Sequence, residues 1–350
     1  MSARRAPRVG VVIVNYNTGD YLDRALECLL AQTSPPDRII VVDNASDDGS
    51  VEGFATRFPS VELLEPGENL GFAAANNLGV ARCVDCDLVA LVNPDAFPEP
   101  AWLETLVAAA ARHPEYAVFG SRLIDDADSR FLDGTGDCYH VNGVAYRRDG
   151  GAPAGIGRQT GETFSACAAA VLYRRNAFIA VGGFDESFFC YYEDTDLAFR
   201  LRLDGQRCLY VADAVAGHAG SVTAGLSSEF TVYHSARNQT WTFVKNMPGP
   251  LLWLYLPQHL LLSALVVLRA VPQRRARAAL AGKRDAVRGL PRVLRKRRRI
   301  QANRRVGALE VRRTMSRGLS VYFLPLVLFA RARRRRRDRS QASEAAVSTL

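Results

Sequence analysis

Short runs of consecutive apolar residues, each closed by polar or turn-forming residues, recur through the first third of the chain. They are typical of buried strands and occupy 9–14, 39–42, 61–64, 88–92 and 116–120. Segments with apolar residues at helical spacing lie between and beside them, at 20–32 (with Asp20 as the expected N-cap), 51–58, 72–83 and 98–112. This alternation predicts an α/β fold built on a doubly wound, mostly parallel sheet.

Polar residues stand where these strands end. Asn93-Pro94 stops the strand at 88–92, because proline cannot donate a hydrogen bond to a neighbouring strand and Asn favours turns. Asp95 is therefore expected just past the carboxyl end of a central strand, where open α/β sheets bind ligands. Its carboxylate could hold a hard cation that faces phosphates, or simply cap the next helix. Asp43-Asn44 ends the second strand in the same way, so this half is expected to bind a nucleotide.

The pattern changes after residue 120. Residues 121–161 are rich in Asp, Gly and Arg and predict loops with an irregular hairpin. A strand at 164–173, a helix at 174–181 and a strand at 207–211 are expected to follow. His218 lies beyond them in a Gly-flanked loop, either as an ordinary loop or core histidine or as a metal ligand.

Three carboxylates follow an aromatic segment in this second half. Glu193, Asp194 and Asp196 are expected in the first turn of a helix, where the helix dipole stabilises negative charge. The aromatic residues before them are Phe184, Phe188, Phe189, Tyr191 and Tyr192. Aromatic walls beside a carboxylate can also form a cleft that excludes water and binds sugars. One of these carboxylates is therefore a candidate general base.

The net charge of +9 averages two unlike parts of the chain. Residues 269–339 hold 25 of the 45 Lys and Arg but only 3 of the 36 Asp and Glu, which leaves 20 basic and 33 acidic residues elsewhere. An acidic body with a basic extension suits an anionic membrane surface or a nucleic acid. Because no recognisable nucleic-acid module accompanies the extension, a nucleic-acid-binding protein is the remote alternative.

Two apolar runs accompany the basic residues. The run 251–268 approaches the length of a spanning helix, about 20 residues, but Pro257-Gln258-His259 interrupts it, and 319–330 is too short to span alone. Arginine is dense between and after them, at 283–317 and 331–339. The pattern favours a helical extension on an anionic membrane surface over one that simply exposes a solvated basic face.

Targeting and redox features are sparse. The N-terminal MSARRAPRVG has no apolar segment typical of a signal peptide, so the body is expected in the cytoplasm. The seven cysteines are scattered, and most lie in apolar runs, which indicates reduced structural thiols. Zinc or redox chemistry at Cys83 and Cys86 is the minority interpretation.

Six motifs occur in order between about residues 9 and 240. They are V-V-I-V-N-Y-N (11–17), V-V-D-N-A-S-D-D-G-S (41–50), N-L-G-F-A-A-A-N-N-L-G (69–79), L-V-N-P-D (91–95), V-G-G-F-D-E-S-F-F-C-Y-Y-E-D-T-D-L-A-F-R (181–200) and H-A-G-S (218–221), followed by A-R-N (236–238). Together they resemble family 2 glycosyltransferases with the nucleotide-diphospho-sugar transferase (GT-A) fold, in the bacterial rhamnosyltransferase-like branch.

The resemblance implies a role for each matching residue. Asp194 would be the catalytic base, with Glu193 and Asp196 supporting the acceptor side. Asp95, at the position of the family's Asp-x-Asp motif, and His218 would hold Mg²⁺ or Mn²⁺. The residues expected to bind the nucleotide sugar are Tyr16, Asn17, Asp43, Asn44, Asn69, Gly71, Asn76 and Asn93.

The implied reaction is an inverting, metal-dependent sugar transfer, with rhamnose from dTDP-rhamnose as the expected donor and a UDP- or GDP-sugar as the alternative. The implied acceptor is a hydroxyl of a cell-envelope glycan, carried on a polyprenyl diphosphate lipid. The enzyme is expected in the cytoplasm, peripherally or partly inserted at the inner face of the cell membrane.

The expected organisation follows from the motifs and the charge pattern. A GT-A domain would occupy 1–245, with a nucleotide-binding half at 9–120 and an acceptor and catalytic half at 121–245. A membrane-associating helical extension at 246–340 and a disordered tail at 341–350 would follow.

Overall fold

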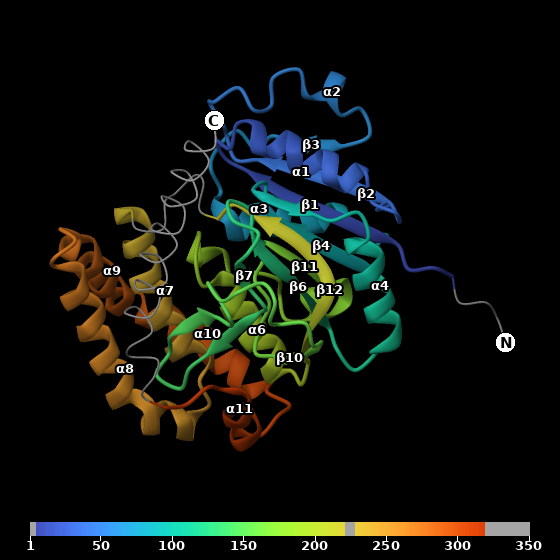
Figure 1. The fold of residues 1–350 in the computed structure, drawn as a ribbon. Coiled ribbons are helices and arrows are strands. Elements are labelled where there is room, and N and C mark those ends of the chain that lie inside the picture. The colour runs from blue at the N-terminus through green and yellow to red at the C-terminus, as the bar shows by residue number, and fades with distance from the viewer. Residues whose placement is uncertain (1–4, 221–227, 319–350) are drawn as a thin grey trace, which may run out of the picture.

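A ten-stranded sheet organises the computed structural model, which describes residues 5–220 and 228–318 (Figure 1). The strand order is β10-β12-β6-β11-β4-β1-β2-β3, with β5 paired to β12 and β7 paired to β6, while β8 and β9 form a separate hairpin. The strands are β1 (Val9–Asn15), β2 (Arg38–Asp43), β3 (Glu62–Leu64), β4 (Leu88–Val92), β5 (Ala96–Pro98), β6 (Val118–Asp125), β7 (Leu132–Gly134), β8 (Asp137–Tyr139), β9 (Ala145–Arg147), β10 (Gly161–Thr163), β11 (Ala170–Arg174) and β12 (Cys208–His218).

Helices cover both faces of this sheet. The helices of the sheet domain are α1 (Asp20–Leu30), α2 (Phe54–Arg57), α3 (Gly71–Arg82), α4 (Trp102–Arg112), α5 (Arg175–Ala180), the 3₁₀ helix η1 (Glu186–Phe188) and α6 (Glu193–Leu203). The carboxyl-terminal helices are α7 (Glu229–Asn246), α8 (Gly249–Ala270), α9 (Ala276–Arg288), α10 (Leu290–Ala302) and α11 (Ala308–Thr314).

The first half confirms the predicted doubly wound arrangement. β1 pairs in parallel with β2 and β4, and β2 pairs in parallel with β3. Successive side chains of a strand point to opposite faces, so Val11 and Ile13 pack with α1 and α4, whereas Val12 and Val14 pack with α3, α5 and α6. Two apolar layers therefore hold the strand ends that carry the polar motifs.

The second half is mixed rather than mostly parallel. β11 runs antiparallel between β4 and β6, while β12 is parallel to β6. The expected strand at 164–173 corresponds to β11, which begins only at Ala170. The stretch 121–161 contains the end of β6 and the short strands β7, β8 and β9. Three-residue strands rich in Asp, Gly and Arg carry no apolar run, so the hydrophobic pattern did not reveal them.

Three local expectations differ from the structure. Gly19, with a φ of 52°, is the N-cap of α1, so Asp20 is the first helical residue instead of the cap. The helix α2 is only four residues long. His218 is the last residue of β12 rather than part of a loop, because β12 continues past a bulge to pair with both β5 and β6. That extension places His218 beside Ala96.

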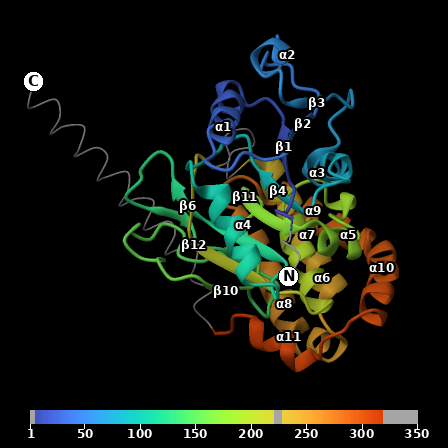
Figure 2. The ribbon, with the colours of Figure 1, turned by 90° about the vertical axis from the view of Figure 1, so that its right-hand side faces the viewer.

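The carboxyl-terminal helices gather on the side of the molecule opposite α1 and α2 (Figures 1 and 2). They share an apolar cluster with the second half of the sheet domain, which includes Tyr139, Phe164, Phe199, Phe243 and Tyr255. The expected boundary at 245–246 falls at the end of α7. The predicted apolar run 319–330, the arginines of 331–339 and the tail 341–350 lie outside the described residues.

Helix α8 is continuous, although Pro257 lies inside it. Within the described ranges it is the one helix long and apolar enough to cross a membrane by composition. One face of α8 is buried against the protein, at Leu251, Tyr255, His259, Leu262 and Ala270. The His259 ring stacks on Phe243 at 4.1 Å between centroids, and its Nδ1 lies 2.8 Å from the carbonyl oxygen of Asn142. The buried face and the two contacts of His259 hold α8 against the rest of the protein.

The cysteines are free thiols. Cys83 and Cys86 are buried, and burial raises the pKa of both. No group of three or more His, Cys, Asp and Glu side chains in the described ranges is arranged to hold a metal ion by itself. The structure therefore gives no support to a zinc site at the C-x-x-C sequence.

Candidate active site

A cavity of about 610 Å³ lies at the carboxyl ends of β1 and β4, between the two halves of the sheet domain. Nine of the thirteen predicted site residues line it: Tyr16, Asn44, Asn69, Gly71, Asn93, Asp95, Glu193, Asp194 and His218. Motifs that are up to 202 positions apart in the chain thus converge on one space.

Four predicted residues do not line the cavity. The Asp43 carboxylate is buried behind it and accepts hydrogen bonds from Asn15 Nδ2 (2.8 Å) and Ser46 Oγ (2.6 Å). Asn17 exchanges hydrogen bonds with Asp47 in the neighbouring loop. Asn76 is buried in α3 and donates to the carbonyl of Phe72, one turn earlier. The fourth residue, Asp196, faces the carboxyl-terminal helices instead.

Asp95 and His218 meet because β5 and β12 are paired. Ala96 is opposite His218 in the register, which leaves His218 Nε2 3.4 Å from Asp95 Oδ1. On the other side of the ring, Nδ1 lies 2.8 Å from Asp133 Oδ2. Burial lowers the pKa of His218, but the hydrogen bonds to Asp133 and then to Asp95 outweigh it and raise the pKa to about 9.

Two oxygen atoms in the cavity wall are buried without a hydrogen-bond partner among the described residues. They are Asn93 Oδ1, beside Asp95 in the chain, and Glu193 Oε2, beside Asp194. A buried polar atom without a partner is costly, on the order of 1–3 kcal/mol, so such atoms indicate a ligand or an ion. Both therefore mark the cavity as a binding site.

Asp194 is held at the amino-terminal end of α6. Its Oδ1 accepts the backbone N–H of Thr195 at 2.6 Å. Burial raises the pKa of Asp194 above its ordinary value, partly offset by the Thr195 hydrogen bond and by the positive charge of Arg147. Burial and the neighbouring Asp194 charge raise the pKa of Glu193 well above its ordinary range. A buried carboxylate with a raised pKa is suited to accept a proton.

A strained aromatic loop leads into α6. Phe189, Tyr191 and Tyr192 line the cavity with φ values of 65°, 68° and 68°, in the left-handed region that costs a bulky residue about 1–3 kcal/mol. Gly71 makes room for this loop, because a Cβ at that position would lie 2.5 Å from the Phe189 ring. The loop conformation must therefore be held by other contacts.

Helix α7 supplies those contacts. The side-chain amide of Asn238 is fully buried and donates to the carbonyls of Phe188 (3.0 Å), Cys190 (2.8 Å) and Tyr191 (2.7 Å). Arg237 Nη2 also donates to the Phe188 carbonyl, at 2.8 Å. One asparagine thus fixes the loop that forms the aromatic wall and positions the first turn of α6.

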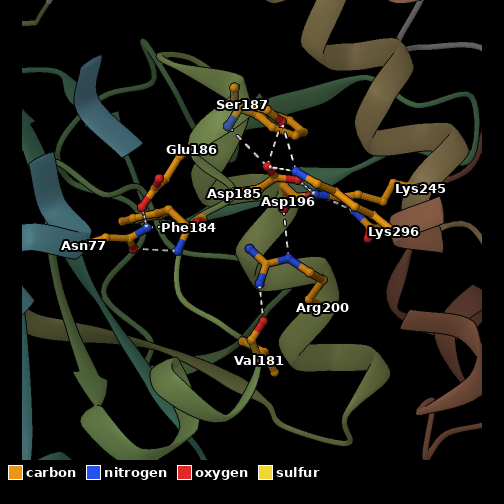
Figure 3. A network of polar contacts seen from close by, with 12 residues as sticks. Asn77, Val181, Phe184, Asp185, Glu186, Ser187, Asp196, Arg200, Lys245 and Lys296 are labelled. Carbon is orange, nitrogen blue, oxygen red and sulfur yellow. Dashed lines mark hydrogen bonds and ion pairs between the residues drawn. The ribbon is translucent and has the colours of Figure 1, made fainter. Parts of the chain in front are cut away.

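A buried charge network fixes the same segment from the far side (Figure 3). Lys245 Nζ on α7 lies 2.6 Å from Asp185 and 2.7 Å from Asp196, and Lys296 of α10 reaches Asp185 at 2.5 Å. Arg200 pairs with Asp196 at 2.9 Å. Because Asp196 is fully buried in this network, it acts on the cavity only by anchoring α6.

Three charged residues at or beside the site were not singled out from the sequence. Asp133 supports His218, Arg147 lines the cavity and pairs with Asp133, and Asp137 is buried near Arg147 and Asp194. All three come from the short strands β7, β8 and β9. Burial raises the pKa of Asp137 to about 7 despite the opposing charge of Arg147. Their only signal in the sequence was the density of Asp and Arg between 121 and 161.

Comparisons with known proteins identify the family of this chain. The model of glycosyl transferase family 2 matches residues 10–182. The chain is 32% identical over 255 residues to the N-acetylglucosaminyl-diphospho-decaprenol L-rhamnosyltransferase of Mycobacterium tuberculosis, covering 65% of this chain and 81% of that protein. It is 28% identical to the O-antigen biosynthesis protein RfbC of Myxococcus xanthus, covering 60% of this chain but 17% of that protein.

Solved structures confirm the fold. GalNAc-T7 with UDP, GalNAc and Mn²⁺ superposes with a TM-score of 0.57 at 13% identity, covering 69% of this chain and 48% of that chain. The mannosyltransferase PcManGT from Pyrobaculum calidifontis, in complex with GDP-Man and Mn²⁺, gives a TM-score of 0.50 at 20% identity, with coverages of 88% and 86%. The chain has the GT-A fold and belongs to glycosyltransferase family 2, in its rhamnosyltransferase-like branch.

Proposed function

We propose that this glycosyltransferase moves a sugar from a nucleoside diphosphate sugar to a hydroxyl of a lipid-linked glycan, with inversion at the anomeric carbon and with a divalent cation. One observation carries the proposal: the Asp95–His218 pair, the unpartnered Asn93 Oδ1 and the buried Asp194 carboxylate line a single cavity. This arrangement supports a phosphate site and a general base within reach of one substrate.

The residues of this cavity fit Mg²⁺ or Mn²⁺. Asp95 would offer carboxylate oxygen, and His218 would offer imidazole nitrogen once the cation displaces the proton that Asp133 and Asp95 favour on the ring. Both ligand types suit such cations. Two side chains leave most of the coordination sphere open, so the diphosphate oxygens of the donor would complete it. When bound, the cation supplies positive charge that stabilises the departing nucleoside diphosphate. The solved structures of GalNAc-T7 and PcManGT contain Mn²⁺, which supports this cofactor.

The proposed chemistry is a single displacement. Asp194 accepts the proton of the acceptor hydroxyl as its oxygen forms a bond to the anomeric carbon. The bond between that carbon and the diphosphate oxygen breaks, and its electron pair leaves with the nucleoside diphosphate. Attack from the side opposite the leaving group inverts the configuration and forms no covalent intermediate. Phe189, Tyr191 and Tyr192 would hold the sugar and exclude water.

The proposed donor is dTDP-rhamnose and the proposed acceptor a glycan on polyprenyl diphosphate. Support comes from the relative that is 32% identical and is named for rhamnosyl transfer to N-acetylglucosaminyl-diphospho-decaprenol. The alternative donors are UDP- and GDP-sugars. Tyr16 and Asn44 line the cavity at its nucleotide end, and neither carries a charge that selects one base over another.

We place the protein at the cytoplasmic face of a membrane, with α8 lying in the plane of the surface. The exposed face of α8 is an apolar stripe of Trp253, Leu254, Leu260, Leu261 and Leu268, each at least 55% exposed. Because the opposite face is buried against the protein at Leu251, Tyr255, His259, Leu262 and Ala270, α8 is better suited to lie on a membrane than to cross it. An apolar stripe beside basic helices also favours a lipid surface over a nucleic acid.

A donor panel tests the proposed function. Thermal unfolding would be followed with dTDP-rhamnose, UDP- and GDP-sugars, each with Mg²⁺, Mn²⁺ or EDTA. We expect one donor to raise the unfolding temperature, and only when a cation is present, because ligand binding to the native state stabilises it. Asp95→Asn should remove most of the cation-dependent increase in the unfolding temperature. Equal stabilisation with and without EDTA would contradict the metal role of Asp95.

A further inference from the structure

A second cavity, of about 440 Å³, lies between the start of α8 and α10. Its lining residues are Gly249, Leu294, Arg297, Arg298, Gln301 and Arg304, none of which lines the active-site cavity. Three guanidinium groups and, in the part of the chain that the structure describes, no carboxylate border one small space. We call it the basic cavity.

Within the described ranges, the three arginines of the basic cavity have no acidic partner. The ion pairs formed by residues 276–314 involve Arg284, Arg288, Lys296 and Arg305 instead. Arg304 Nη1 is buried and has no hydrogen-bond acceptor among the described residues. Arg297 is held in place, since its Nη1 donates to the carbonyls of Val244 (2.7 Å) and Met247 (2.5 Å). Burial, and then the charge of Arg304, lower the pKa of Arg297.

The end of α8 adds to this positive charge. Gly249 opens a helix of 22 residues that has no acidic residue in its first turn and no side-chain cap. A helix amino terminus carries about half a positive charge, so it repels the arginines beside it. An anion in the basic cavity would neutralise both, and guanidinium groups bind phosphate oxygens with paired hydrogen bonds.

We propose that the basic cavity is a phosphate-binding site separate from the donor site. Leu294, on its rim, is 43% exposed, and the apolar stripe of α8 begins at Trp253, about one turn after Gly249. A phosphate that carries acyl chains, as in an anionic phospholipid, would fit both features. Free phosphate shares the recognised group. The site requires neither sugar donor nor glycan acceptor, so it goes beyond the proposed function.

Two charge-matched double variants of the full chain test the site. Arg298→Ala with Arg304→Ala removes two charges from the basic cavity, whereas Arg295→Ala with Arg299→Ala removes two exposed charges of α10 outside it. Each would be assayed for cosedimentation with phosphatidylcholine vesicles, with and without phosphatidylglycerol. Calorimetric titration with inorganic phosphate, without divalent cation, forms the second arm. Arg298→Glu, at an exposed position, serves as a further variant should the first unfold.

If the bound phosphate belongs to a lipid, the cavity variant loses binding to phosphatidylglycerol vesicles by at least about tenfold more than the control variant. If the site binds free phosphate, the two double variants bind vesicles equally, and only the cavity variant loses binding of inorganic phosphate. Wild-type binding to neither probe, or equal behaviour of the two double variants in both arms, overturns the proposal. Because no nucleotide sugar is present, these outcomes are independent of the donor panel.

Discussion

Replacing Asp194 by Asn is expected to lower kcat by at least about 10²–10⁴-fold, the usual contribution of a positioned general base. Asn cannot accept the proton of the acceptor hydroxyl, but it keeps the size of the side chain. Donor affinity should change little, because Asp194 comes from α6 and not from the strand ends that carry Tyr16, Asn44 and Asp95, the residues proposed to hold the donor. Initial rates at saturating donor, together with calorimetric donor affinity, separate the two effects.

The kcat of the wild-type enzyme is expected to depend on the ionisation of Asp194 and therefore on pH. Burial raises the pKa of Asp194, so its protonated form persists to higher pH than for an exposed aspartate. Since only the ionised carboxylate can act as base, kcat should rise with pH through this raised pKa and then level off. Asp194→Asn should abolish that limb of the profile. A variant that retains near-wild-type rate with the same pH profile would show that another group is the base.

Replacing Asn238 by Ala is expected to lower kcat strongly and to reduce the free energy of unfolding by about 2–4 kcal/mol. The substitution leaves three carbonyls of the loop 188–191 without their shared donor. The left-handed residues Phe189, Tyr191 and Tyr192 are then free to relax, and the first turn of α6 shifts with them. Denaturant unfolding and steady-state kinetics on the same preparation measure both effects.

Two further variants separate positioning from general instability. Asn238→Asp keeps the shape of the side chain but removes the N–H donors, so it should reproduce the loss of kcat. Leu106→Ala truncates a buried residue of α4, far from the loop, and should cost a similar 2–5 kcal/mol of stability while leaving kcat intact below its unfolding temperature. If Asn238→Ala and Leu106→Ala give the same kcat, Asn238 is only a structural residue.

The strand ends of the first half were predictable because a short, continuous apolar run between turn-forming residues forms a buried strand of a parallel sheet. The runs at 9–14 and 88–92 became β1 and β4, and the polar residues after them line the cavity at Tyr16 and Asn93. Periodicity fixes where a strand ends but not where each side chain points. That is why Asn76, in the expected helix, turns out to be buried away from the cavity.

The second half was harder to predict, because its site depends on contacts between distant segments. Asp133 meets His218 across 85 positions, and Asn238 reaches the aromatic loop across about 50. Neither pairing leaves a local pattern. The three acids at 193–196 look alike in sequence, yet α6 turns Asp194 toward the cavity and Asp196 toward Lys245. Only the packing of α6 against α7 distinguishes their roles.

The anomeric configuration of the product tests the proposed inverting sugar transfer most directly. Wild-type protein would be incubated with dTDP-rhamnose, Mg²⁺ and N-acetylglucosaminyl-diphospho-polyprenol in vesicles, and the glycolipid analysed by NMR. We predict a product one sugar longer, with inverted configuration, that forms with wild type but not with Asp194→Asn or in EDTA. Retained configuration, or no transfer from dTDP-, UDP- and GDP-sugars alike, would contradict the account.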